Sequence, residues 1–165
     1  MTTEDFTKRR AWFEAYLEKR PGKPRFVCFC CGYPTLTERA EYDICCLCWW
    51  EDVGLDDPSI TSPGHSTPLW RARQNFADHL TMYERGKDTR AGGPDSFLIV
   101  QAKKALIAAY EALRLSLKKT SLSSLWKLAR DAEKRLYKLH TQSVKEYVRA
   151  QRKVRTKNSN DHRRT

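Results

Sequence analysis

The chain has 165 residues, 31 Lys and Arg, 20 Asp and Glu, and a formal net charge of +11. That length suits one domain or a small module with a helical appendage, and no apolar run reaches the roughly 20 residues of a membrane span. The charged N-terminal segment lacks the apolar region of a signal peptide, so we expect a cytoplasmic protein with no membrane partner.

The first predicted element is an amphipathic helix over residues 3–19. Five large apolar residues recur at helical spacing before Pro21-Gly22 ends the run: Phe6, Trp12, Phe13, Tyr16 and Leu17. We assign residues 1–23 to this helix and expect it to cover the module that follows.

Six cysteines then lie within residues 28–48. Cys28 and Cys31 form one C-x-x-C pair, and Cys45 and Cys48 form a second pair after a gap of 13 residues. In a reducing compartment, paired cysteines at this spacing indicate a tetrahedral metal site more often than disulfides or a redox motif. Gly32 permits the positive φ of a tight turn after the second thiolate. The pattern predicts one structural Zn²⁺, with iron as the main alternative occupant.

Three further residues remain candidates for an auxiliary metal-binding or redox role. Cys30 and Cys46 stand in C-x-C registers with the predicted ligands, a spacer too short for the usual zinc turn, and the plainer interpretation is a buried thiol. His65 could replace one thiolate, although four well-spaced cysteines already fill a tetrahedral shell.

The stretch CFCCGYPTLTERAEYDICCLCWWEDVGLDDP, with the following HSTPLWRARQNF, resembles the bacterial cysteine-rich CPCC family over roughly residues 26–80. Phe29 and Cys46 stand where the family pattern has proline, whereas the four paired cysteines match it. The resemblance implies a zinc-ribbon-like module with no established reaction, found in cytoplasmic proteins of bacteria.

Residues 24–93 form the predicted module. We expect strands around residues 26–29 and 42–44 to bring the cysteine pairs together. A helix follows, with Thr67 as N-cap, Pro68 at the first helical position and Gly86 just past the end. Its predicted buried stripe consists of Leu69, Ala72, Phe76, Leu80 and Tyr83.

Residues 94–152 predict an antiparallel helical hairpin, and residues 153–165 a disordered basic tail. The first helix, over residues 95–118, would bury Leu98, Ala102, Ala105, Ala109 and Leu113. The second, over residues 122–150, would bury Leu125, Ala129, Ala132, Leu136, Leu139 and Tyr147. The fold class is therefore small α+β: a four-cysteine zinc-ribbon-like module with flanking helices, followed by the hairpin. Such apolar faces also suit a homodimer.

The charge is concentrated in the hairpin and the tail. Residues 1–95 carry 13 Lys and Arg against 15 Asp and Glu, whereas residues 96–165 carry 18 against 5. We expect Lys103 and Lys104 on the outside of the hairpin. The predicted polyanion-binding residues, most of which recur at intervals of three, four or seven, are Lys127, Arg130, Lys134, Arg135, Lys138, Lys145, Arg149 and Arg152.

These observations favour a non-enzymatic zinc-binding protein whose basic hairpin binds nucleic acid or the ribosome. The alternative is a protein-interaction adaptor, or an immunity or regulatory protein, with an acidic protein partner. A catalytic site has less support, because no nucleophile–base constellation or phosphate-binding loop occurs and four thiolates leave no open metal position.

Overall fold

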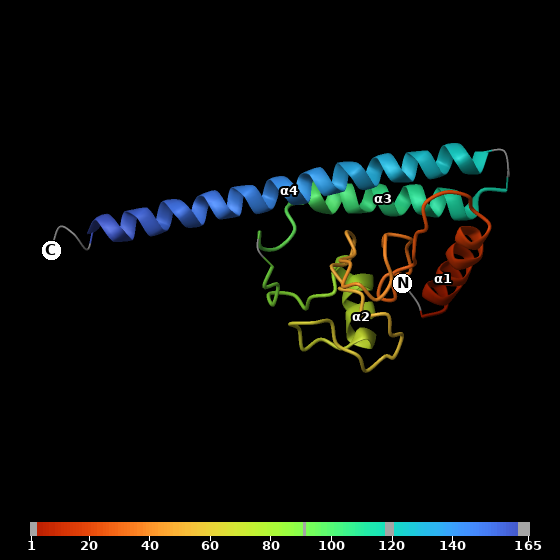
Figure 1. The fold of residues 1–165 in the computed structure, drawn as a ribbon, viewed down its shortest axis with the longest axis horizontal. Helices are drawn as coiled ribbons and strands as arrows, with labels where there is room; N and C mark the ends of the chain where they lie inside the picture. Colours follow the sequence, from red (N-terminus) through yellow and green to blue (C-terminus); the bar gives the residue numbers. More distant parts are fainter. Residues whose placement is uncertain (1–2, 91, 118–120, 162–165) are drawn as a thin grey trace.

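The computed structural model describes residues 3–90, 92–117 and 121–161 and contains four helices within them. They are α1 (Thr3–Glu18), α2 (Leu69–His79), α3 (Phe97–Leu115) and α4 (Leu122–Asp161). Figure 1 shows α3 and α4 as an antiparallel pair along one side of the molecule, with α1, α2 and the cysteine-rich loops on the other. No helix in these ranges is both long enough and apolar enough to cross a bilayer.

The cysteine-rich segment folds without extended strands among the described residues. Its backbone pairing is limited to three isolated antiparallel bridges, Phe26–Leu36, Ile44–Glu51 and Thr61–Pro68. Two of these bridges close the loops that carry the cysteine pairs. The β part of the expected α+β class is therefore not confirmed: the fold is mostly helical, with a module of irregular loops in place of the predicted strands.

Helix α1 lies where the sequence places it. Phe13 is fully buried and contacts Tyr33 of the cysteine-rich loops and Tyr110 of α3, with ring centroids 6.0 and 5.6 Å apart. Arg9, on the same helix, is also buried and donates two hydrogen bonds to the Cys31 carbonyl. Helix α1 therefore covers the first cysteine loop with both apolar and polar contacts.

Helix α2 is shorter than predicted at both ends. Pro68, not Thr67, occupies the N-cap position and makes the bridge to Thr61. The helix stops at His79 because Leu80 adopts a left-handed conformation with φ of 61°. Met82 then turns back, donating to the Cys48 carbonyl at 2.7 Å and accepting from Asn75 at 2.8 Å. Contacts to the second cysteine loop thus end the helix before Gly86.

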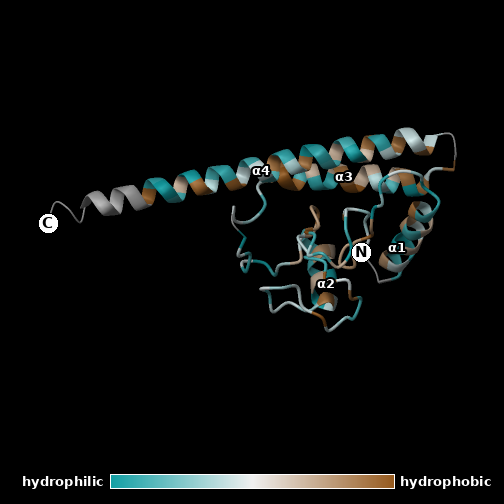
Figure 2. Ribbon diagram, in the orientation of Figure 1, coloured by the Kyte–Doolittle hydropathy of each residue, from teal (hydrophilic) through white to brown (hydrophobic). Residues whose placement is uncertain are grey.

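The predicted hairpin is present, with a different buried face on α3. Leu98 and Ala105 lie on the outside of the molecule, and Lys103, expected there, is fully buried. The buried residues of α3 are Ile99, Ala102, Lys103, Leu106, Ala109, Tyr110 and Leu113. Because apolar residues occur at nearly every angle around this helix, periodicity did not identify the buried side. Figure 2 shows brown and teal residues interspersed along the visible side of α3.

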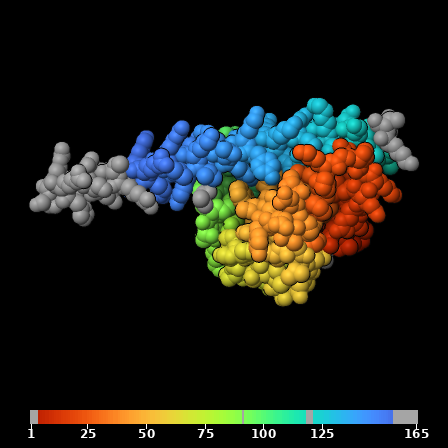
Figure 3. Space-filling view, in the orientation of Figure 1, coloured from red at the N-terminus to blue at the C-terminus, as the bar shows by residue number. Residues whose placement is uncertain are grey.

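Helix α4 continues to Asp161, so the predicted disordered tail is helical over residues 153–161. Residues 162–165 lie outside the described part of the chain. Figures 1 and 3 show α4 extending well past the end of α3 and past the cysteine-rich module. From Lys145 to Val154 every side chain is exposed. We call residues 145–161 the arm.

One hydrophobic core joins the hairpin to the cysteine-rich loops. Its buried members include Phe13 of α1, Tyr33, Leu47 and Trp50 of the loops, and Leu106 and Tyr110 of α3. Tyr33 also donates to Glu111 of α3 at 2.9 Å. The module therefore packs directly against the helical pair.

Candidate metal centre

The two cysteine pairs are carried by backbone turns of the same kind. In the first turn, Gly32 N–H donates to the Cys28 carbonyl at 2.8 Å and Cys28 N–H donates to Tyr33 at 2.9 Å. In the second, Trp49 donates to Cys45 and Cys45 donates to Trp50, both at 2.9 Å. We call these turns the first and second knuckles. Each directs two thiols toward the same point.

Gly32 and Trp49 occupy equivalent positions in the knuckles, with φ of 75° and 70°. Glycine suits the first knuckle in conformation and in space, since a Cβ on Gly32 would lie 3.2 Å from both Arg9 Nε and the Phe6 ring and those side chains would have to shift. Trp49 adopts the same left-handed conformation despite its side chain, which packs between Arg90 and His140.

The four sulfur atoms of Cys28, Cys31, Cys45 and Cys48 lie within 4.8 Å of one another. The Sγ atoms of Cys28 and Cys48 are 3.6 Å apart, as are those of Cys31 and Cys45. A tetrahedral ion with metal–sulfur bonds of about 2.3 Å requires sulfur–sulfur distances of about 3.8 Å. The cluster can therefore hold one metal ion with little rearrangement.

Burial gives these thiols a further reason to bind a cation. All four are completely buried. Loss of solvent raises the pKa of Cys28, Cys31 and Cys48 well above the ordinary thiol value. Burial opposes ionisation of Cys45 too, but hydrogen bonds from the other three cysteines and from Thr35 lower its pKa. Several buried thiolates in contact would repel one another, so a cation at their centre is needed to hold them ionised.

Neighbouring residues orient the sulfurs without joining the cluster. Thr35 Oγ1 lies 3.0 Å from the Cys45 Sγ and can donate to a thiolate there. The two hydrogen bonds from Arg9 hold the Cys31 carbonyl, at 3.1 and 2.8 Å. Beside the second knuckle, buried Asp52 accepts from Arg39 at 2.7 Å and from the Ala40 N–H at 2.9 Å. The C-x-x-C pattern alone did not identify these supporting residues.

Cys30, Cys46 and His65 do not belong to the four-residue cluster. Cys30 is buried and lines a cavity between α1 and α2. Cys46 is buried with its Sγ 3.9 Å from the Glu133 carboxylate, and burial raises its thiol pKa strongly. The His65 ring contacts Tyr83 edge to face, with Nε2 3.4 Å from the phenol oxygen.

The second knuckle also contacts α4. Trp49 packs on His140 with ring centroids 4.5 Å apart, and the Arg90 guanidinium lies 4.4 Å from the Trp49 ring. Glu133 is buried and pairs with Arg25, at the start of the module, and with Arg130 of α4. The sequence pattern predicted Arg130 among the polyanion-binding residues, but in the structure its guanidinium pairs with buried Glu133.

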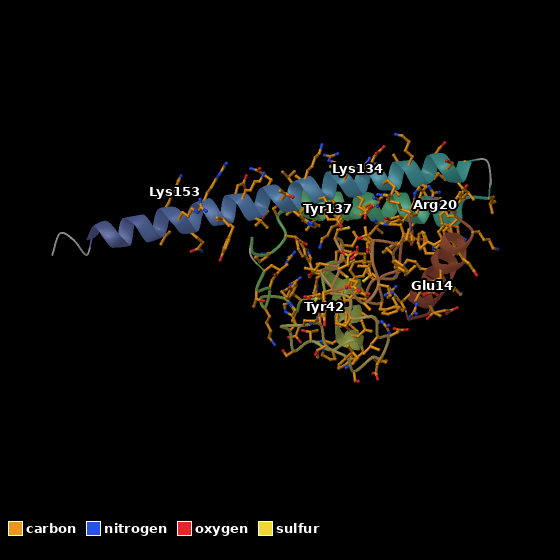
Figure 4. The ribbon with its side chains drawn as sticks, in the orientation of Figure 1. Glu14, Arg20, Tyr42, Lys134, Tyr137 and Lys153 are labelled. Atoms are coloured by element: carbon orange, nitrogen blue, oxygen red, sulfur yellow. The ribbon has the colours of Figure 1, made fainter. Side chains whose placement is uncertain are left out.

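The other predicted cations lie on the exposed side of α4. At 100° per residue, Lys127, Lys134, Lys138, Lys145, Arg149 and Arg152 fall within about 60° of one another around the helix. We call these six residues the basic face. Arg135 is exposed about 80° away. Lys127 and Lys134 also pair with Asp131. In Figure 4, Lys134 and Lys153 lie on the side of α4 that faces away from the cysteine-rich module.

The family comparison agrees with this geometry. The model of the family described as Cysteine-rich CPCC matches residues 26–105, which include both knuckles, α2 and the first half of α3. Residues 26–105 belong to the Cysteine-rich CPCC family. The suspected resemblance is confirmed, and the match continues beyond residue 80 into the hairpin. Comparisons with curated proteins and with solved structures give no match.

The longer match agrees with the packing. Within the matched part of α3, Ile99 and Ala102 are buried in the common core, and Lys103 donates at 2.8 Å to the Leu80 carbonyl at the end of α2. The first turns of α3 are thus part of the CPCC module's core, whereas α4 lies outside the matched residues.

Proposed function

We propose that the protein is a non-enzymatic nucleic-acid-binding protein in which one structural Zn²⁺ stabilises the CPCC module and α4 contacts the phosphate backbone. The observation that carries this proposal is the basic face of α4, opposite the buried side of the helix and continued along the arm.

Zinc is the proposed metal because four thiolates at these separations suit its tetrahedral preference. Iron can occupy the same kind of site. Metal analysis of the purified protein, together with its visible absorption spectrum, distinguishes the two ions. One zinc per chain in a colourless protein supports zinc, because the d¹⁰ ion has no visible absorption whereas ferric thiolates are coloured. A chain that holds iron when both metals are supplied would contradict this assignment.

The proposed contacts are electrostatic. The basic face extends from Lys127 to Arg152, about 37 Å along the helix at 1.5 Å per residue. Lysine and arginine side chains along such a face can neutralise phosphates but read no base sequence. The side chains from Lys145 to Val154 are exposed, so the cations among them can approach a large ligand without obstruction from the module. The phosphate backbone of DNA or RNA, including ribosomal RNA, can supply these contacts.

Fluorescence anisotropy tests the proposal with the full chain, metal-loaded, against duplex DNA, single-stranded RNA and structured RNA. The log of the binding constant should fall with log salt, by about 0.9 per phosphate neutralised on duplex DNA. Replacing Lys145, Arg149 and Arg152 together by Gln should weaken binding by at least about tenfold and make the salt dependence shallower.

The matched control replaces Lys8, Lys19 and Lys23, three exposed lysines outside the hairpin, by Gln. It removes the same charge and should change affinity little. Equal loss in both triple variants would show that net charge rather than the basic face is responsible. No binding of any of the three nucleic acids at low salt would overturn the proposal.

The alternative is a protein-interaction adaptor with an acidic partner, including an immunity or regulatory role. The exposed apolar side chains of α3, Phe97, Leu98 and Leu115, favour it, because a protein interface combines such groups with charge. The same face could join two copies of the chain, which sedimentation would detect. A protein interface loses less affinity in salt than a phosphate-binding one, so the titration separates these functions.

In the proposed function the metal has no catalytic role. Four cysteine ligands fill a tetrahedral shell, leaving no position for a metal-bound water. What supports a structural role is burial of the cluster under α1, α2 and the hairpin.

A further inference from the structure

A cavity of about 540 Å³ lies between α1 and α2, at the first knuckle. Its volume is within the range of small-molecule sites, roughly 300–1,000 Å³. Phe6 of α1 and Trp70 and Phe76 of α2 supply aromatic walls, and Cys30 supplies a buried thiol. Neither the basic face nor the four-sulfur cluster lines this cavity.

Three arginines also line the cavity, and internal contacts fix each of them. Arg9 is held by the Cys31 carbonyl. Arg10 pairs with Glu14 and Asp56, and Arg73 pairs with Asp56 and donates to the Phe29 carbonyl at 2.9 Å. These hydrogen bonds use Nε and Nη1 of Arg10 and Nε and Nη2 of Arg73. One terminal nitrogen of each is outside these bonds and can donate to a ligand.

The aromatic rings hold the guanidinium groups in place as well. The Arg73 guanidinium carbon lies 4.6 Å from the Phe6 ring centroid, and that of Arg10 lies 4.8 Å from the Phe29 centroid. Trp70 is 49 % exposed, so much of its indole remains available for contact. Donors fixed in this way lose little side-chain entropy when they bind an anion.

We propose that this cavity binds a small planar aromatic molecule with one anionic group, a carboxylate or a monophosphate. The aromatic ring packs against Trp70 and Phe6, and the anionic group accepts hydrogen bonds from Arg10 and Arg73. Guanidinium groups match the geometry of both anions.

The charge around the cavity favours a single anionic group over a polyphosphate. Arg9, Arg10 and Arg73 supply three positive charges, but Asp78 also lines the cavity and Asp56 pairs with two of the arginines. Glu14 pairs with Arg10 as well, so the sum over these six groups is 0. Additional phosphates would approach Asp78 without further cations to balance them.

Isothermal titration calorimetry tests the inference on the full, metal-loaded chain. The probes are indole-3-acetate and adenosine monophosphate, each compared with its neutral counterpart, indole-3-ethanol or adenosine. At least one anionic probe should bind, at least about tenfold more tightly than its neutral counterpart. Adenosine triphosphate should bind this cavity more weakly than the monophosphate. Equal affinity of anionic and neutral probes, or no binding of either anion, would overturn the proposal.

Ala77→Trp provides the site-specific variant, because residue 77 lines the cavity and an indole there would occupy it. Binding of the anionic probe should fall at least about tenfold. Ala108→Trp is the control, since Ala108 is exposed on α3, away from the cavity. Metal content and the thermal transition of both variants are measured alongside. Should Ala77→Trp fail to fold, Arg73→Gln replaces it with the same expected loss. Undiminished binding in the folded cavity variant would move the ligand elsewhere and contradict the inference.

Discussion

At the scale of single residues, the six cysteines lie in different surroundings. Four sulfurs meet at one point, whereas Cys30 faces a cavity and Cys46 lies beside Glu133. The two C-x-x-C pairs were predicted from sequence because the knuckle is a local structure, set by four or five consecutive residues. The surroundings of Cys30 and Cys46 depend on α1, α2 and α4, which no local spacing encodes.

Replacing a clustered cysteine should therefore differ sharply from replacing Cys46. Cys31→Ser or Cys45→Ser leaves three sulfur ligands, and we expect zinc well below one per chain with loss of the cooperative thermal transition. Cys46→Ser should retain full zinc content. Metal analysis and thermal unfolding under reducing conditions measure both effects. Equal zinc loss from Cys46→Ser would refute the four-ligand assignment.

His140 makes the stability of the fold sensitive to pH. Burial, and then the nearby charge of Lys103, lower its pKa from 6.5 to about 4. As pH falls below 6.5, the His140 imidazole becomes protonated in the unfolded chain but stays neutral in the folded chain. The free energy of unfolding therefore decreases as pH falls, until the folded chain is protonated as well at about pH 4. At pH 5.5 the loss should be about 1.4 kcal/mol relative to neutral pH.

Comparison of the wild-type chain with His140→Phe measures this contribution. Urea unfolding between pH 7.5 and 5.5, with zinc content checked at each point, should show a smaller pH dependence for His140→Phe because only the wild type carries the imidazole. Parallel curves for the two proteins would mean that other groups cause the dependence.

At the scale of elements, long-range contacts explain the errors in the predicted boundaries. Helix α2 ends at His79 because Met82 pairs with Cys48, a residue 34 positions earlier. The buried side of α3 was ambiguous because its apolar residues nearly surround it, and Lys103 lies on the side that packs. Capping at Ser96, which accepts from Ile99 N–H, was by contrast available locally.

Lys103 should be essential to the packing of α3 on α2. It is fully buried, donates to the Leu80 carbonyl at 2.8 Å and pairs with Asp95 at 2.6 Å. Lys103→Met would remove the hydrogen-bond donor to the Leu80 carbonyl. It would also leave Arg90 as the remaining ion-pair partner of Asp95. We expect the free energy of unfolding to fall by about 3 kcal/mol, as for other broken buried ion pairs.

Lys104→Met supplies the matched control, because Lys104 is the next residue along α3 and is exposed. Its free energy of unfolding should change by less than about 0.5 kcal/mol. Urea titrations of both variants give the comparison, and similar destabilisation by the two substitutions would count against a specific role for the buried ammonium.

At the scale of the whole molecule, α4 packs against the single hydrophobic core and then continues beyond it. The described side chains of α4 from Lys145 to Val154 are all exposed, whereas Ser143 still contacts the Gly92 carbonyl at 3.4 Å. A chain ending at Val144 should therefore retain its zinc and its thermal transition but lose at least about tenfold in nucleic-acid affinity. Anisotropy, metal analysis and thermal unfolding check the three parts of this prediction. If the shortened chain bound nucleic acid as tightly as the full chain, the arm would not be part of the proposed interface.

The placement of α4 makes it a lever with its support at the CPCC module. The contacts between the module and this helix include Trp49 on His140, Arg25 on Glu133 and the Ser143 hydroxyl on the Gly92 carbonyl. The arm extends about 25 Å beyond the last of the core contacts at 1.5 Å per residue. Tilting the helix by 5° at its support would move its far end by about 2 Å, more than half the length of a hydrogen bond. A side-chain change at the second knuckle that tilted α4 would therefore move charges that lie far from it.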